Sequence, residues 1–242
     1  MKLFCKLFIF VVLIGLLAMS CSTVSYCYYQ VGEIRPVEDN VKIDKDSKLI
    51  YFDDNIFMEY SFWGSYGNVS FVIKNITDKD ISIHLDKSFF IRNGMAYDYF
   101  QNRAYMIVPA KTFKIINQFS VTDFMYRSCD LYLWKSFLSE DEAKKRSFRS
   151  NGDILNKLVF NTKNTPLLFE NRLVYSLEGL DDKIEVVNKF YVKSIQNMPE
   201  DEFEYYVEER DCGEDNVELY RAQFAPNKYY IKYDESSFDS NY

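Results

Sequence analysis

Carboxylates are the abundant reactive side chains of this sequence, which contains 36 aspartates and glutamates but only one histidine, His84. With one histidine, neither an HExxH zinc site nor a Ser-His-Asp or Cys-His nucleophile can be assembled on its usual plan. The sequence also lacks the GxSxG, GxxxxGKS/T and GxGxxG motifs. A glycoside hydrolase needs only two facing carboxylates, but spacing alone selects no pair, whether Asp53-Asp54 or Glu208-Glu209. We therefore predict no catalytic residues, and we place His84 on the outward face of a strand.

The C-terminal region is rich in acids and aromatics. Ten acids lie between Glu200 and Glu218, with Arg210 as the only base among them. The segment "DCGEDN" (211–216) offers oxygen ligands but lacks the alternating D-x-D-x-D-G order of an EF-hand loop. We predict no metal and no cofactor there. Residues 203–207 are expected to dock on the body, and residues 208–216 to project as a solvated loop.

An apolar run near the N-terminus decides the compartment. Lys2 and Lys6 precede "LFIFVVLIGLL" (7–17), a run of eleven apolar residues. This length fits the h-region of a secretory signal, about 7–15 residues. It falls short of the roughly 18 apolar residues that a membrane-spanning helix needs. We predict a signal peptide over residues 1–20. An uncleaved anchor reaching Val24 and a plain secreted protein are the alternatives.

The end of this run carries a recognisable pattern. Leu17-Ala18-Met19-Ser20-Cys21 resembles a bacterial lipobox, with small Ser20 directly before the cysteine. The resemblance implies cleavage between Ser20 and Cys21, lipid attachment to the Cys21 sulfur, and acylation of the new N-terminus. Several acyl chains on one residue give stable anchoring to a lipid bilayer. Because Ser22 follows Cys21 and the first acid is Glu33, the resemblance implies the inner leaflet of an outer membrane, facing the periplasm.

The remaining cysteines and the overall charge limit the possible partners. Five cysteines are present; cleavage removes Cys5 and lipid occupies Cys21, which leaves Cys27, Cys129 and Cys212. At most one disulfide can form among three, and no pair has CxxC spacing. The formal net charge is −7, so the chain has no electrostatic footprint for nucleic acid.

Short alternating segments predict a mainly β body over residues 49–197. In "NVSFVIKN" (68–75), Val69, Phe71 and Ile73 recur with a period of two, which places them on one sheet face. Further strands are predicted at residues 56–63, 81–85, 112–121, 129–134, 154–160, 172–177 and 184–195, with an edge strand at 228–233. Strands at such short spacing favour an antiparallel sandwich.

Three local signals complete this architecture. Asn93-Gly94 predicts a two-residue hairpin turn. "SEDEAKKRSFR" (139–149) begins with a capping box and predicts one short surface helix. Residues 21–48, with no helical apolar stripe, are expected to be a tether, and residues 198–242 a partly docked C-terminal region. The segment from Asn68 to Tyr99 resembles the immunoglobulin-like modules of exported bacterial proteins, which implies an immunoglobulin-like sandwich.

Aromatic side chains make up 18% of the residues, which suits the half-buried surfaces of a sandwich core. Trp63 and Trp134 are the candidates for an exposed aromatic binding platform. The leading hypothesis is a membrane-anchored lipoprotein of the cell envelope that acts as a non-catalytic binding module for an envelope protein or glycan. The alternatives are a cell-surface adhesin or pilus-like structural component, and a carboxylate-dependent glycoside hydrolase.

Overall fold

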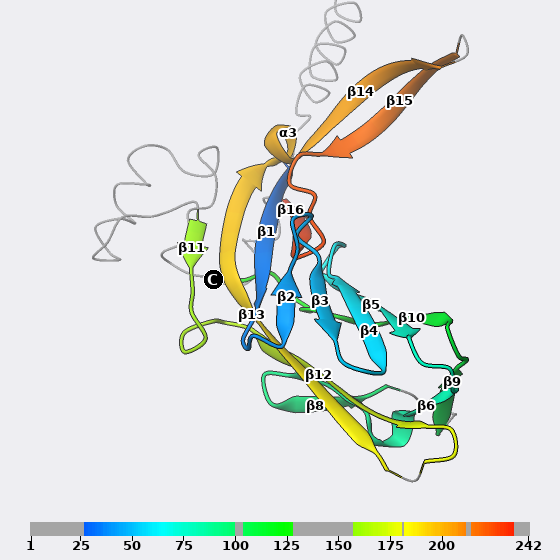
Figure 1. The fold of residues 1–242 in the computed structure, drawn as a ribbon. Coiled ribbons are helices and arrows are strands. Elements are labelled where there is room, and N and C mark those ends of the chain that lie inside the picture. Colours follow the sequence, from blue (N-terminus) through cyan, green and yellow to red (C-terminus); the bar gives the residue numbers. More distant parts are fainter. Residues whose placement is uncertain (1–26, 100–103, 128–156, 181, 212–213, 235–242) are drawn as a thin grey trace, which may run out of the picture.

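The computed structural model describes residues 27–99, 104–127, 157–180, 182–211 and 214–234. Over these residues the chain folds mainly into antiparallel strands, as the sequence predicts. They form two sheets that share one hydrophobic core, and a separate two-stranded ribbon (Figure 1). The immunoglobulin-like character of the sandwich stays a prediction. The predicted helix at 139–149 and the predicted strand at 129–134 lie outside the described residues.

The larger sheet has nine strands in the described part of the chain, with the central order β16-β1-β13-β12-β6-β9. Its strands are β1 (Cys27–Pro36), β6 (Ile81–His84), β7 (Phe89–Arg92), β8 (Met95–Asp98), β9 (Tyr105–Val108), β11 (Lys157–Val159), β12 (Leu168–Leu177), β13 (Ile184–Pro199) and β16 (Lys228–Asp234). β11 adds to β13, and the β7–β8 hairpin adds to β12. A 3-10 turn, η1 (Leu85–Lys87), follows β6.

The smaller sheet packs across the larger one and has the order β10-β5-β4-β3-β2. Its strands are β2 (Val41–Ile43), β3 (Leu49–Phe52), β4 (Ile56–Ser61), β5 (Asn68–Asn75) and β10 (Phe113–Ser120). β5 has the predicted bounds, and Val69, Phe71 and Ile73 are buried as their alternation indicated. The shared core therefore forms because the inward sets of both sheets are apolar.

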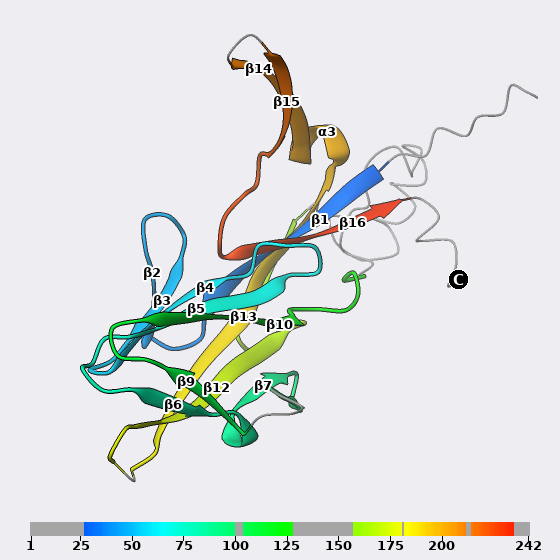
Figure 2. The same cartoon turned by 90° about the vertical axis from the view of Figure 1, so that its right-hand side faces the viewer.

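A short helix and the two-stranded ribbon follow the end of β13. They are α3 (Glu200–Phe203), β14 (Glu204–Asp211) and β15 (Glu214–Arg221), after which the chain returns to the sandwich as β16. Among the described strands, β14 and β15 pair only with each other. Both views show the ribbon extending away from the sandwich (Figures 1 and 2). β16 is an edge strand, as predicted.

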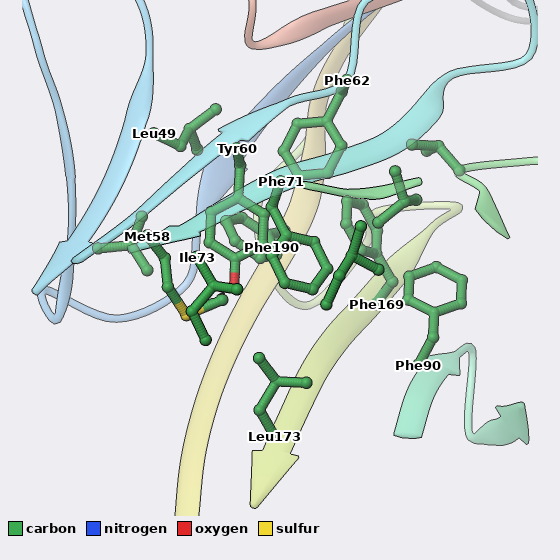
Figure 3. Close-up of a cluster of buried hydrophobic side chains, with 14 of the residues drawn as sticks. Leu49, Met58, Tyr60, Phe62, Phe71, Ile73, Phe90, Phe169, Leu173 and Phe190 are labelled. Atoms are coloured by element: carbon green, nitrogen blue, oxygen red, sulfur yellow. Dashed lines mark hydrogen bonds between the residues drawn. The ribbon is translucent and has the colours of Figure 1, made fainter. Parts of the chain in front are cut away.

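Aromatic rings fill the space between the two sheets (Figure 3). Phe190 of β13 lies at the centre, with Tyr60 edge-on at 4.9 Å, Phe62 edge-on at 5.3 Å and Phe169 stacked at 5.4 Å between ring centroids. Such edge-to-face and offset arrangements suit the quadrupole of aromatic rings. The high aromatic content of the sequence is thus explained largely by the core.

One polar network crosses this apolar core. The Tyr60 hydroxyl accepts hydrogen bonds from the amide nitrogens of Asn171 (2.7 Å) and Asn188 (2.8 Å), which are cross-strand neighbours in β12 and β13. Tyr99 donates to the Asn171 oxygen (2.7 Å), and Asn40 donates to the Asn188 oxygen (3.0 Å). Burial raises the pKa of Tyr60 well above its usual range, so the hydroxyl stays neutral.

The Asn93-Gly94 turn is confirmed. Arg92 pairs with Met95 across the β7–β8 hairpin, and both turn residues have positive φ, 49° for Asn93 and 83° for Gly94. This left-handed pair is the backbone of a type I′ turn. The Asn93 side chain also fastens the turn to β12, because its oxygen accepts the Leu168 amide at 2.8 Å.

The predicted tether is wrong from Cys27 onward. β1 lies between β13 and β16, paired with both, and Tyr28, Tyr29, Val31 and Ile34 are buried. The strand is covered on both faces, so its sequence does not alternate and shows no strand signal. Gln30 is also buried, and it bonds both backbone polar groups of Tyr126 and the side chain of Asn197. Residues 41–43 belong to β2, so the sandwich extends well before residue 49.

Gly32 allows β1 and β16 to pack closely. It pairs directly with Tyr229, whose ring folds over it, and a methyl group at Gly32 would overlap that ring. Substitution Gly32→Ala should destabilise the protein by about 2–3 kcal/mol, because the overlap can be relieved only by moving a buried tyrosine. Denaturant unfolding measures this loss.

A double-mutant cycle provides the control. In a Tyr229→Leu background the ring is gone, and adding Gly32→Ala should then cost under about 1 kcal/mol. An equal cost of the alanine in both backgrounds would contradict the proposed packing of β1 against β16.

Candidate functional site

Within the residues that the structure describes, no group of three His, Cys, Asp or Glu side chains could hold a metal ion. His84 lies on the face of β6 opposite the core residues Ile81 and Ile83, as the alternation predicted. It is nevertheless buried there, with Nε2 3.0 Å from the Ser176 hydroxyl and its ring edge-on to Tyr105. Burial lowers its pKa, which favours the neutral imidazole.

Asp53, one of the adjacent acids, has a structural role. One carboxylate oxygen accepts the backbone amides of Asn55 and Ile56, both at 2.8 Å, and so closes the turn between β3 and β4. The other accepts the hydroxyls of Tyr51 (3.0 Å) and Tyr175 (3.1 Å). Tyr175 comes from β12, so this carboxylate ties the smaller sheet to the larger one. Its accepting positions are used for folding.

The predicted platform tryptophan is partly covered. Trp63 is half-buried, and three rings surround it: Phe203 stacks at 6.0 Å, Tyr230 is tilted at 5.1 Å and Phe224 is edge-on at 5.2 Å. These contacts leave Trp63 only partly exposed, and its use as a binding platform stays a prediction. Trp134 lies outside the described residues. Trp63 instead belongs to a second hydrophobic cluster, which we call the ribbon base, with Tyr29, Val31, Met198, Phe203 and Tyr230.

Phe203 is the centre of the ribbon base. It is the last residue of α3 and is fully buried, and its ring stacks on Tyr29 of β1 at 4.0 Å. Pro199 ends β13 opposite Tyr28, so α3 begins directly beside the start of β1. The backbone oxygen of Phe203 also accepts the amide of Ala222 at 2.9 Å, which joins the two ends of the ribbon. The sequence prediction that Phe203 docks on the sandwich is confirmed.

Ion pairs surround this apolar contact. Arg221 pairs with Glu204 (2.9 Å) across the first rung of the ribbon, and its guanidinium lies over the ring of Tyr230 at 5.3 Å. Lys232 pairs with Glu200 (2.6 Å), and this contact raises the pKa of the lysine. Burial, and then a hydrogen bond to Glu204, raise the pKa of Tyr29 above its ordinary value. The ribbon is thus attached by stacking, backbone bonding and charge together.

Beyond its base, the acidic segment forms a ribbon rather than the predicted loop. Residues 208–211 pair with residues 214–217 in register, so the loop predicted over 208–216 is a hairpin for most of its length, although it projects from the sandwich as expected (Figure 1). The docking predicted for Tyr205 and Tyr206 is also wrong, because both side chains are exposed. The available strand signal was the β-favouring residues of the two strands, and the density of acids obscured it; these residues are Tyr205, Tyr206, Val207, Val217 and Tyr220.

Comparison with family models, with curated proteins and with solved structures finds no match to this chain. Within the described residues, none of the helices has both the length and the apolar character needed to cross a bilayer. The candidate site is therefore chosen from the geometry of the described residues, as the surface best suited to binding another molecule. It is a ribbon with exposed tyrosines, attached to the sandwich through a buried phenylalanine.

The attachment of the ribbon can be tested with two phenylalanines that both contact Trp63. Phe203→Ala should destabilise the protein by about 3 kcal/mol or more, because it removes a fully buried ring from the ribbon base. Phe224→Ala should cost under about 1 kcal/mol, because that ring is 64% exposed. Equilibrium unfolding in urea reads both, and similar losses for the two variants would contradict this description of the base.

Proposed function

We propose that this chain is a lipid-anchored envelope protein that acts as a non-catalytic binding module. The observation that supports a binding role is the ribbon of β14 and β15, which extends from the sandwich and keeps Tyr205, Tyr206 and Tyr220 exposed. Tyrosine is enriched where proteins bind one another, because it buries a large area at a small cost in side-chain entropy. The attachment through Phe203 holds these side chains on a defined base.

The anchor is proposed at Cys21, from the lipobox-like sequence that precedes it. β1 begins at Cys27, six residues further on. Because an extended chain spans at most about 3.3–3.6 Å per residue, this link reaches roughly 20 Å. An acylated Cys21 would therefore hold the sandwich close to the bilayer, most simply the inner leaflet of an outer membrane with the body facing the periplasm.

A second candidate function is a structural component that assembles by strand addition. Within the described residues, β10 is an eight-residue edge strand of the smaller sheet, and its Phe113 and Ile115 are exposed. Edge strands with exposed apolar side chains can pair with another chain. This adhesin-like candidate requires concentration-dependent oligomers of the purified protein, which light scattering would detect, whereas the binding module requires none.

The anchor is tested by replacing two nearby cysteines in turn. Cys21→Ala should abolish incorporation of labelled fatty acid and leave the uncleaved precursor, because the attachment sulfur and the cleavage site are both lost. Cys27→Ala, a change inside β1, should retain labelling and cleavage. Undiminished labelling of the Cys21→Ala protein would refute the proposed anchor.

A further inference from the structure

Both faces of the ribbon carry exposed apolar side chains next to its base. Tyr205 pairs with Tyr220, their rings stacked at 5.9 Å, and on the next rung Tyr206 pairs with Leu219. Because neighbouring residues of a strand point to opposite faces, the first pair lies on one face and the second on the other. All four side chains are exposed, and Tyr206 is 72% exposed. Both faces of the ribbon therefore offer apolar surface to a binding partner.

The ribbon has little stability of its own. A two-stranded ribbon is marginally stable in water unless another element covers a face, and among the described strands β14 and β15 pair with nothing else. Its attachment at Phe203 fixes one end, while eight residues in each strand extend from that end (Figure 2). Exposed aromatic pairs on such an arm are suited to burial against a partner.

The charge of the ribbon identifies the chemistry of that partner. Between Glu204 and Arg221 there are seven acids, with only Arg210 and Arg221 as bases. A surface rich in lysine and arginine complements this potential, and Arg side chains also stack on tyrosine faces. Anionic lipid head groups, nucleic acids and a second copy of this acidic chain carry the same sign of charge and are repelled.

The position of the ribbon suggests where the partner is met. Tyr28 at the start of β1 pairs with Pro199, directly before α3, so the ribbon base and the N-terminal end of the sandwich coincide. If Cys21 is acylated, which is the function proposed above, the arm starts within a short link of the bilayer. We propose that the β14–β15 ribbon is a docking arm for a membrane-associated protein that presents a basic surface.

Photo-crosslinking of the full-length chain in the cells that make it tests this inference. Tyr206→p-benzoylphenylalanine places the probe on the arm, and Phe52→p-benzoylphenylalanine places it on the sandwich at a side chain of similar exposure, 66%. Mass spectrometry then identifies the crosslinked peptide. The expected result is an adduct from position 206, absent from position 52, with a protein whose linked segment has a net positive charge.

Charge neutralisation on the arm provides a second readout. The triple change Glu208→Gln, Glu209→Gln and Glu218→Gln should reduce the adduct about five- to tenfold, as expected when three ion pairs to a basic partner are lost together. A matched triple change at exposed acids of the sandwich, Asp39→Asn, Asp46→Asn and Asp54→Asn, should leave the adduct unchanged.

Several outcomes would overturn the docking arm: an adduct at 206 no stronger than at 52, an adduct with lipid or with a second copy of the chain, or an adduct insensitive to the glutamine changes. The anchor fails separately, because fatty-acid labelling reports on Cys21 alone. If a chain that carries no fatty acid still crosslinks to a basic partner, the docking arm is supported and its location at the membrane is refuted.

Discussion

The insertion of β1 between β13 and β16 is the constraint on which the rest of the structure depends. It brings the first described residues into contact with the last, because Cys27 pairs with Asp234 and Tyr28 with Tyr233. The close approach needs a glycine at position 32, where the ring of Tyr229 occupies the space of a side chain. Without this strand, β16 would lose its pairing partner and the ribbon base would lose Tyr29 and Val31.

The two faces of β1 serve different parts of the molecule. Toward the smaller sheet, Ile34 joins the aromatic core around Phe190, which holds the sandwich together. On the opposite face, Tyr29 belongs to the ribbon base, where it stacks on Phe203 and so positions the ribbon. The proposed docking arm therefore depends on the same strand as the fold. A partner that pulled on the arm would transmit load through Phe203 to a strand hydrogen-bonded on both sides, close to the proposed anchor.

The sequence predicted those parts of the fold in which one face is buried and the other is wet. The alternation in β5, the Asn93-Gly94 turn and the edge strand at 228–233 were all found as expected. Prediction from the sequence failed where a strand is buried on both faces, and where a polar side chain is buried because it forms hydrogen bonds within the protein. The sequence of β1 shows no alternation, because polar Gln30 is buried and forms hydrogen bonds with Tyr126 and Asn197. His84 is likewise buried, with its ring in contact with the Ser176 hydroxyl. The docking of Phe203 was predictable from its apolar character amid acids, whereas Tyr205 and Tyr206 were misplaced because an extended ribbon was not foreseen.

Amide hydrogen exchange of residues 27–36 tests the central claim most directly, because a strand paired on both sides and a solvated tether differ by orders of magnitude in protection. The amides of Tyr29 and Val31 should exchange as slowly as those of β13, their partner strand, and should approach the rate set by global unfolding. Exchange of these amides within seconds, while β13 remains protected, would show that β1 is a tether after all and would remove the support for both the sandwich topology and the ribbon base.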